Sequence, residues 1–168
     1  MFNQGRWEGP ILDQHMHLDR NNRYFSAISE FINSGGTAIN LVHKPNFSDL
    51  PSTISDYRLA YDDTIDMARE IREKFGIKVS VILGPHPVSW EKQVHTIGLQ
   101  ESTSLHLQAV KLAIKYISSG EAVCLGEVGR PHYPVSLEIW DAANDLLLEI
   151  MKLAAEAKIS IQLHVEDD

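Results

Sequence analysis

The sequence predicts an α/β fold of the (β/α)8 TIM-barrel type, in which only about the first five β-α units are present. Five short β-type runs alternate with helical patterns, and this order indicates a parallel sheet. Within the runs, apolar and polar residues alternate. Strands covered by helices on both faces read as continuous apolar runs, so the alternation favours a barrel with a polar lumen over an open doubly wound sheet.

The positions of the elements follow from periodicity and from turn residues. Strands are expected at 11–18, 37–44, 78–86, 121–129 and 159–167. Helices are expected at 24–35, 53–76, 103–120 and 136–158. Three glycines stand where helices end and left-handed caps are typical, namely Gly35, Gly76 and Gly120. The loop 45–52 and the segment 87–100 follow the second and third strands, and both could roof a site.

The last expected strand shows the alternation clearly. One face carries the apolar residues Ile159, Ile161, Leu163 and Val165. The other face, which suits the barrel lumen, carries Ser160, Gln162, His164 and Glu166.

The chain is expected to be a single domain, residues 1–168, that forms the N-terminal part of a barrel. A complete barrel typically needs about 250 residues, so the chain is expected to end before strands six to eight. An unfinished sheet would have an open edge able to pair with another chain, and oligomerisation is therefore an expectation from geometry.

The composition indicates where the protein is located in the cell and which binding partners are disfavoured. The formal net charge of −8 argues against a surface that holds nucleic acid throughout, because phosphate neutralisation needs clustered Lys and Arg. The sequence shows neither a leader pattern nor an apolar run of roughly 18 residues, which predicts no membrane association. The single Cys124 fits a reducing cytoplasm, the expected location.

Histidines gather where the expected strands end, which is the face of a parallel barrel that carries the active site. His15 and His17 form an H-x-H pair on the first strand, Glu127 lies near the end of the fourth, and His164 lies near the end of the fifth. Imidazole and carboxylate groups bind divalent metals, and a glutamate can bridge two ions. The sequence therefore predicts a centre for one or two divalent ions, with Zn, Mg and Mn as candidates.

The remaining polar residues are open to more than one interpretation. Asp13 is expected to accept a hydrogen bond from an imidazole and so orient that ring, rather than to bind the metal. Asp19 is expected to cap a helix or form a turn. Substrate contact and ordinary loop polarity are about equally favoured for His43, His86 and His132. His95 and His106 are expected at the surface or in packing.

In this order, the blocks "ILDQHMHLD", "GPHP", "GEVG" and "IQLHVED" resemble the TatD-related metal-dependent hydrolases of the amidohydrolase superfamily. The resemblance covers essentially the whole chain and implies a TIM barrel that hydrolyses phosphodiesters, with DNase activity in the namesakes. It implies that His15 and His17 bind the first ion, that Glu127 bridges both ions as the catalytic residue, and that His164 binds the second. It also places His86 in the substrate pocket.

One departure from the family pattern follows the fourth strand, where "GEVGRPHY" stands in place of "GEVG" and Leu-Asp. Arg130 therefore brings a cation suited to phosphate or carboxylate to the metals, and Lys44 is a second cation at a strand end. Together with His86 and His132, these two residues are the expected substrate contacts. The expected partner is a phosphodiester or another small substrate, with a nucleic-acid end as one form of it.

Two other functions stay open. One is an amidohydrolase or phosphoesterase that acts on a different bond. The expected fourth strand has no lysine for a carbamylated bridging ligand, which disfavours part of this class. The other is a truncated barrel without catalytic activity that serves as a subunit or scaffold. The family's later histidine on strand six and aspartate on strand eight would lie beyond Asp168.

Overall fold

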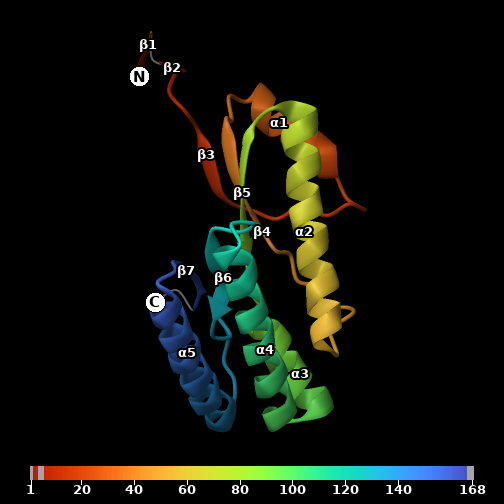
Figure 1. Cartoon of the computed structure of the whole chain (residues 1–168), viewed down its shortest axis with the longest axis vertical. Coiled ribbons are helices and arrows are strands. Elements are labelled where there is room, and N and C mark those ends of the chain that lie inside the picture. Colours follow the sequence, from red (N-terminus) through yellow and green to blue (C-terminus); the bar gives the residue numbers. More distant parts are fainter. Residues whose placement is uncertain (1, 4–5, 166–168) are drawn as a thin grey trace.

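The computed structural model describes residues 2–3 and 6–165. Its main sheet contains five parallel strands, whose spatial order follows the order in the chain. They are β3 (Leu12–Met16), β4 (Ala38–Val42), β5 (Lys78–Leu83), β6 (Cys124–Gly129) and β7 (Ile161–His164). A short antiparallel pair that the sequence did not predict precedes this sheet, formed by β1 (Phe2–Asn3) and β2 (Arg6–Trp7) (Figure 1).

Helices connect the parallel strands, as the predicted alternation requires. They are α1 (Tyr24–Asn33), α2 (Ile54–Phe75), α3 (Pro87–Ile97), α4 (Leu99–Ser118) and α5 (Leu137–Ala157). Helix α4 packs against α2 on one side and α5 on the other (Figure 1). The predicted fold class is confirmed: the described chain folds as four β-α units and a fifth parallel strand of the (β/α)8 barrel type.

The sheet curls strongly, and two side-chain contacts demonstrate it. In a flat sheet, β3 and β6 would lie about 14 Å apart, given the usual strand spacing of about 4.8 Å. Nevertheless, His17 Nε2 lies 3.2 Å from Glu127 Oε2. The amide of Gln162 on β7 donates to the carbonyl of Gln14 on β3, across the concave face, at 3.3 Å. The first and last strands of the sheet therefore face each other over a shared lumen.

The core lies between the sheet and the helices. The helix-facing side chains of the central strands are almost fully buried, including Ile39, Leu41, Val81 and Leu83. They belong to one apolar cluster that also contains residues of α2, α4 and α5, among them Ile71, Ala109 and Ile150. Burial of such a side chain stabilises the fold by about 1.5–3 kcal/mol. This packing fixes the opposite, polar face of the strands toward the lumen.

The local chemistry of helix ends explains where α2 begins and stops. Thr53 and Asp56 form a capping box, in which each side chain accepts a hydrogen bond from the other residue's backbone N–H. The helix ends at Gly76 in a left-handed conformation, with φ of 68°, as predicted. Gly35 and Gly120 also have positive φ, as expected for the predicted left-handed caps.

The segment after the third strand contains a helix that was not among the expected ones, because residues 87–97 are helix α3. His86 caps this helix, since its Nδ1 accepts a hydrogen bond from the Val88 backbone N–H at 3.2 Å. Pro87 occupies the first helical position, where a missing N–H costs nothing. Helix α4 also begins earlier than expected, at Leu99 rather than at 103.

The last strand is shorter than expected, since β7 ends at His164. The predicted lumen position of Glu166 lies outside the described residues. Within the part of the chain that is described, no helix is both long enough and apolar enough to cross a membrane.

Candidate metal centre

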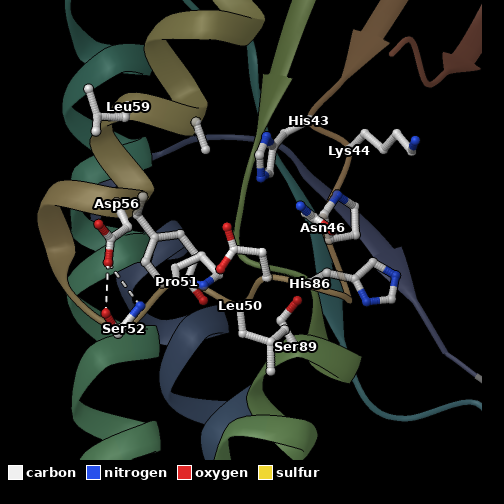
Figure 2. A pocket seen from close by; sticks show the side chains of 14 residues that line it. His43, Lys44, Asn46, Leu50, Pro51, Ser52, Asp56, Leu59, His86 and Ser89 are labelled. Carbon is white, nitrogen blue, oxygen red and sulfur yellow. Dashed lines mark hydrogen bonds between the residues drawn. The ribbon is translucent and has the colours of Figure 1, made fainter. Parts of the chain in front are cut away.

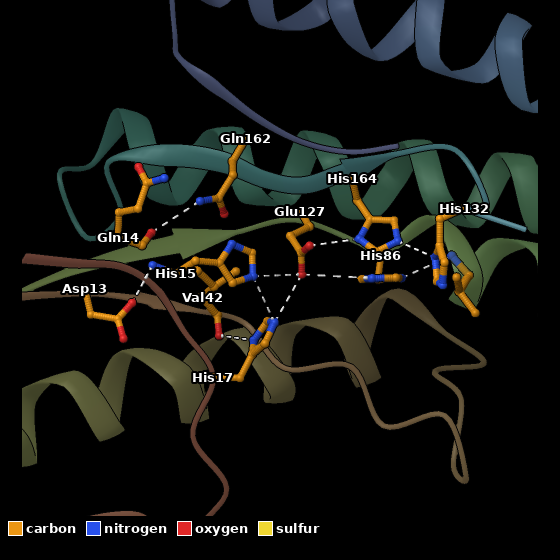
Figure 3. Close-up of polar contacts among 11 residues, drawn as sticks. Asp13, Gln14, His15, His17, Val42, His86, Glu127, His132, Gln162 and His164 are labelled. Atoms are coloured by element: carbon orange, nitrogen blue, oxygen red, sulfur yellow. Dashed lines mark hydrogen bonds and ion pairs between the residues drawn. The ribbon is translucent and has the colours of Figure 1, made fainter. Parts of the chain in front are cut away.

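Glu127, at the C-terminal half of β6, is the centre of a cluster of imidazoles. The residue is only 8% exposed. His15 and His17 approach its carboxylate from β3 on one side, and His164 and His86 approach from the other (Figure 3). The structure therefore brings together the four residues predicted as metal ligands, together with His86.

Three of these side chains form a triangle of ligand atoms. His15 Nε2 and His17 Nε2 lie 3.1 Å apart, and they lie 3.3 and 3.2 Å from Glu127 Oε2. Ligand atoms bound tetrahedrally to one zinc ion at about 2.0–2.1 Å are themselves roughly 3.3 Å apart. The donor set and its spacing therefore fit one divalent ion.

Contacts with the backbone hold His15, on β3, and His17, the residue after β3, in place. His17 Nδ1 donates to the carbonyl of Val42 at 3.1 Å, which directs Nε2 at the cluster. The register of β3 against β4 shifts between Asp13 and Met16, so the strand bulges where His15 lies. Asp13 Oδ1 accepts a hydrogen bond from the backbone N–H of His15 at 2.9 Å. Asp13 thus contacts the backbone at the bulge, and not an imidazole as expected.

A second group of potential ligands lies on the other side of the same carboxylate. His164 Nδ1 lies 2.9 Å from Glu127 Oε1, and His86 Nε2 lies 3.9 Å from Glu127 Oε2. His86 Nδ1 already accepts a hydrogen bond from Val88, so in the neutral ring the proton resides on Nε2. His86 therefore presents an N–H donor to the site rather than a lone pair. Glu127 and His164 are the better ligands in this group.

Electrostatics keep Glu127 ionised. Burial acts to raise the pKa of its carboxyl, but hydrogen bonds from His164 and His17 lower it. The nearby rings of His15 and His86 lower it further, and the pKa lies well below its ordinary value. The centre thus contains a fixed negative charge that can face a cation on either side.

Two glycines allow the strands to bring these side chains together. A Cβ on Gly84 would lie 2.9 Å from three backbone atoms of Gly126, the residue before Glu127. A Cβ on Gly129 would lie 1.8 Å from the backbone oxygen of His164. Because glycine lacks this atom, β6 can approach β5 and β7 closely enough to place Glu127 beside His164.

The two predicted cations lie at the edges of the site. Lys44 Nζ donates to Asp19 Oδ2 at 2.6 Å, and Asp19 also accepts a hydrogen bond from the backbone of Asn21 in a turn. The guanidinium of Arg130 donates to Asn144 at 2.8 Å and lies over the ring of Trp140, both on α5. These contacts lie away from Glu127, and the substrate roles of Lys44 and Arg130 stay predictions.

A pocket of about 420 Å³ opens beside His86, between the segment after β4 and the start of α3 (Figure 2). Lys44, Asn46 and Ser89 contribute to its polar lining. His43 also borders it, and its Nδ1 lies 3.2 Å from Thr64 Oγ1. Burial lowers the pKa of His43 to about 4, so the ring is neutral near pH 7. Several residues of the expected loop 45–52 line the pocket, so this loop forms one of its walls.

His132 lies beside His164, and its role as a substrate contact stays a prediction. Its Nδ1 lies 2.7 Å from His164 Nε2, the ring nitrogen that points away from Glu127. The sequence placed His132 in the loop after β6 but could not indicate which partner its ring contacts.

The sequence did not decide whether His106 lies at the surface or packs in the interior. His106 on α4 is fully buried, and among the described residues neither ring nitrogen has a hydrogen-bond partner. Burial lowers its pKa to about 3, with a smaller contribution from His86. His95, in contrast, lies at the surface and contacts Glu91.

We expect His106 to make the fold sensitive to acid. Its folded pKa of about 3 lies below the ordinary value near 6.5, so the unfolded chain binds more protons. Its contribution to stability is complete above about pH 6.5 and is lost as pH falls toward 3, by about 1.4 kcal/mol per pH unit. H106L should reduce the slope of unfolding free energy against pH between about pH 6 and 4 by this amount. Urea denaturation across this range measures the slope, and H95L is the matched control. An unchanged slope in H106L would contradict the assignment.

The family model described as TatD related DNase matches residues 12–168. Two proteins of Methanocaldococcus jannaschii are similar over 94% of this chain, the uncharacterized protein MJ1127 at 29% identity and the uncharacterized metal-dependent hydrolase MJ0761 at 25%. The matches cover 55% and 54% of these relatives, so the chain spans about half their length.

Among solved structures, Yersinia pestis DHPS with a pterine-sulfa conjugate matches with a TM-score of 0.43 and 14% identity. That match covers 91% of this chain and 57% of the other. The family match is far more specific, because it includes all five strands of the main sheet and every residue of the cluster around Glu127. The chain therefore belongs to the TatD related DNase family.

Proposed function

We propose that this chain carries the metal-binding half of a metal-dependent hydrolase that cleaves phosphodiester bonds of the kind found in nucleic acids. The observation that carries the proposal is the position of Glu127, a buried carboxylate in contact with His17, just after β3, and with His164 on β7. The family description as a DNase supports a phosphodiester substrate, and the name of one relative supports metal dependence.

The residues have distinct roles in this proposal. His15, His17 and Glu127 would hold one divalent ion, while Glu127 and His164 would hold a second. Bound ions of this kind lower the pKa of a water molecule toward about 7 and neutralise charge on a phosphoryl group. Zn, Mg and Mn are the candidates, since imidazole favours the first and carboxylate the other two.

The chain's own groups can orient the substrate. Burial lowers the pKa of His86 to about 4, so the ring stays neutral near pH 7. With Nδ1 occupied by Val88, its Nε2–H is directed at the carboxylate side of the centre and can donate to a nonbridging phosphate oxygen. The adjoining pocket of about 420 Å³ can receive a part of the substrate that does not react, with Lys44 at its edge.

The proposal accounts for the acidic composition. A chain with a formal net charge of −8 has no general attraction for phosphate, and Lys44 is already paired with Asp19. Ions held by the cluster would provide positive charge only where the bond breaks. This arrangement favours a small substrate or a nucleic-acid end over binding along a duplex.

A hydrolysis assay with a metal analysis tests the proposal. We expect the purified protein to contain a divalent ion and to hydrolyse bis-p-nitrophenyl phosphate, with activity lost on chelation and restored by Zn²⁺, Mg²⁺ or Mn²⁺. Parallel assays with p-nitrophenyl acetate and an anilide identify the bond that is cleaved. Hydrolysis of these two alone would reject the phosphodiester assignment, and a protein without bound metal or activity would reject the hydrolase.

A further inference from the structure

We propose that His132 is a positioning residue, which holds His164 in the orientation and tautomer that binds a divalent ion. This inference rests on the proposed function, because it assigns His164 as a ligand. It concerns the segment 130–133, which directly follows β6.

The contacts of His164 divide between its two ring nitrogens. Nδ1 faces Glu127 Oε1 at 2.9 Å, and Nε2 faces His132 Nδ1 at 2.7 Å. The rings of His132 and His164 meet edge to face, with centroids 4.8 Å apart and planes at 71° (Figure 3). His164 is therefore fixed on both sides, by a carboxylate and by an imidazole.

The carboxylate of Glu127 can only accept, so while Nδ1 of His164 donates to it, Nε2 accepts a hydrogen bond from Nδ1–H of His132. An ion bound at Nδ1 would require the other tautomer. A neutral imidazole carries one proton, and a nitrogen that binds a cation must be the unprotonated one. If Nδ1 of His164 is the ligand, the proton is on Nε2 and is donated to Nδ1 of His132. An ion-binding histidine usually donates the N–H of its other ring nitrogen to a carboxylate, a carbonyl or a water molecule. Here an imidazole takes the place of that acceptor.

Geometry separates this role from that of a direct ligand. The two nitrogens of an imidazole ring point in diverging directions, and His132 contacts the one that points away from Glu127. One ion cannot lie against Nδ1 of His164 and also between His164 Nε2 and His132. The group of ligand atoms that includes His164 and Glu127 accordingly does not include His132.

The segment that carries His132 is anchored at several points. Tyr133 donates its hydroxyl to Glu91 on α3 at 2.8 Å, and prolines flank the pair at 131 and 134. The backbone N–H of Arg130 donates to the carbonyl of His164 at 2.9 Å. These contacts limit the movement of His132 although its side chain is at the surface, as a positioning role requires.

A series of substitutions at His132 tests the role by Mn²⁺ binding, measured by calorimetry on the ion-free protein. H132F keeps a ring but cannot accept a hydrogen bond, and it should weaken Mn²⁺ binding about 10–100-fold at one site. H132N and H132D keep an acceptor oxygen and should bind Mn²⁺ close to wild type. H95F makes the ring substitution at a surface histidine and is the matched control.

Each outcome decides the question. Loss in H132F with retention in H132N supports positioning. Equal loss in H132F and H132N would show that His132 is itself a ligand, since an amide is a poor substitute for imidazole, and unchanged H132F would show that it has no role. A wild-type protein that binds no Mn²⁺ would reject the proposed function. Wild-type binding together with an unchanged H132F would reject this inference alone.

Discussion

E127Q should lower the affinity of the protein for divalent ions by at least about 100-fold, more than the 10–100-fold typical for residues that only support a ligand. The substitution keeps the size of the side chain and removes its charge. Glu127 is in contact with both groups of histidines, so neither of the two candidate ion sites keeps its carboxylate. Hydrolytic activity should fall with the affinity.

Two measurements follow the effect of E127Q. Calorimetry with Mn²⁺ gives the affinity directly. A ligand at 100 times its dissociation constant stabilises the folded state by about 2.7 kcal/mol, so thermal unfolding with and without Mn²⁺ gives an independent value. E70Q is the matched control, because Glu70 contacts Arg20 and Tyr24, away from the centre. E127Q that binds Mn²⁺ as well as E70Q would contradict the proposed centre.

The fold was predictable because its signals are local. Strand alternation and capping glycines indicated all five strands of the main sheet and four of the five helices. Helix α3 was missed because its start, Pro87-Val88-Ser89, reads as a loop when considered alone. The cap at its start comes from His86, which the sequence indicated only as a strand-end residue.

The cluster around Glu127 was predictable as a set of residues but not as a set of contacts. Parallel strands put their ends on one face, so His15, His17, Glu127 and His164 were expected to be neighbours. The direction of a side chain after a strand end depends on the loop backbone, which periodicity does not describe. For this reason, Arg130 lies against α5 and His132 contacts His164, and neither contact was expected.

The substitution G129A should destabilise the fold by at least about 3 kcal/mol, because the added Cβ would clash with backbone atoms. Such clashes are among the causes of large mutational effects on stability. Gly129 pairs with His164 in the register of β6 and β7. An added Cβ would lie 1.8 Å from the His164 carbonyl oxygen and 2.7 Å from its carbonyl carbon. Neither atom belongs to a flexible side chain, so the strands must separate. Because β7 carries His164, the affinity for Mn²⁺ should fall together with the stability.

G76A separates this clash from ordinary glycine strain. Gly76 has φ of 68°, with nothing within 4 Å of the position of a Cβ, so G76A should cost only about 1–2 kcal/mol for the left-handed conformation. It lies at the end of α2 and should leave Mn²⁺ binding unchanged. Urea unfolding and calorimetry on both variants give the comparison. If G129A lost no more stability than G76A and bound Mn²⁺ normally, β7 could move away from β6 freely. The close approach at Gly129 would then not be what places His164 beside Glu127.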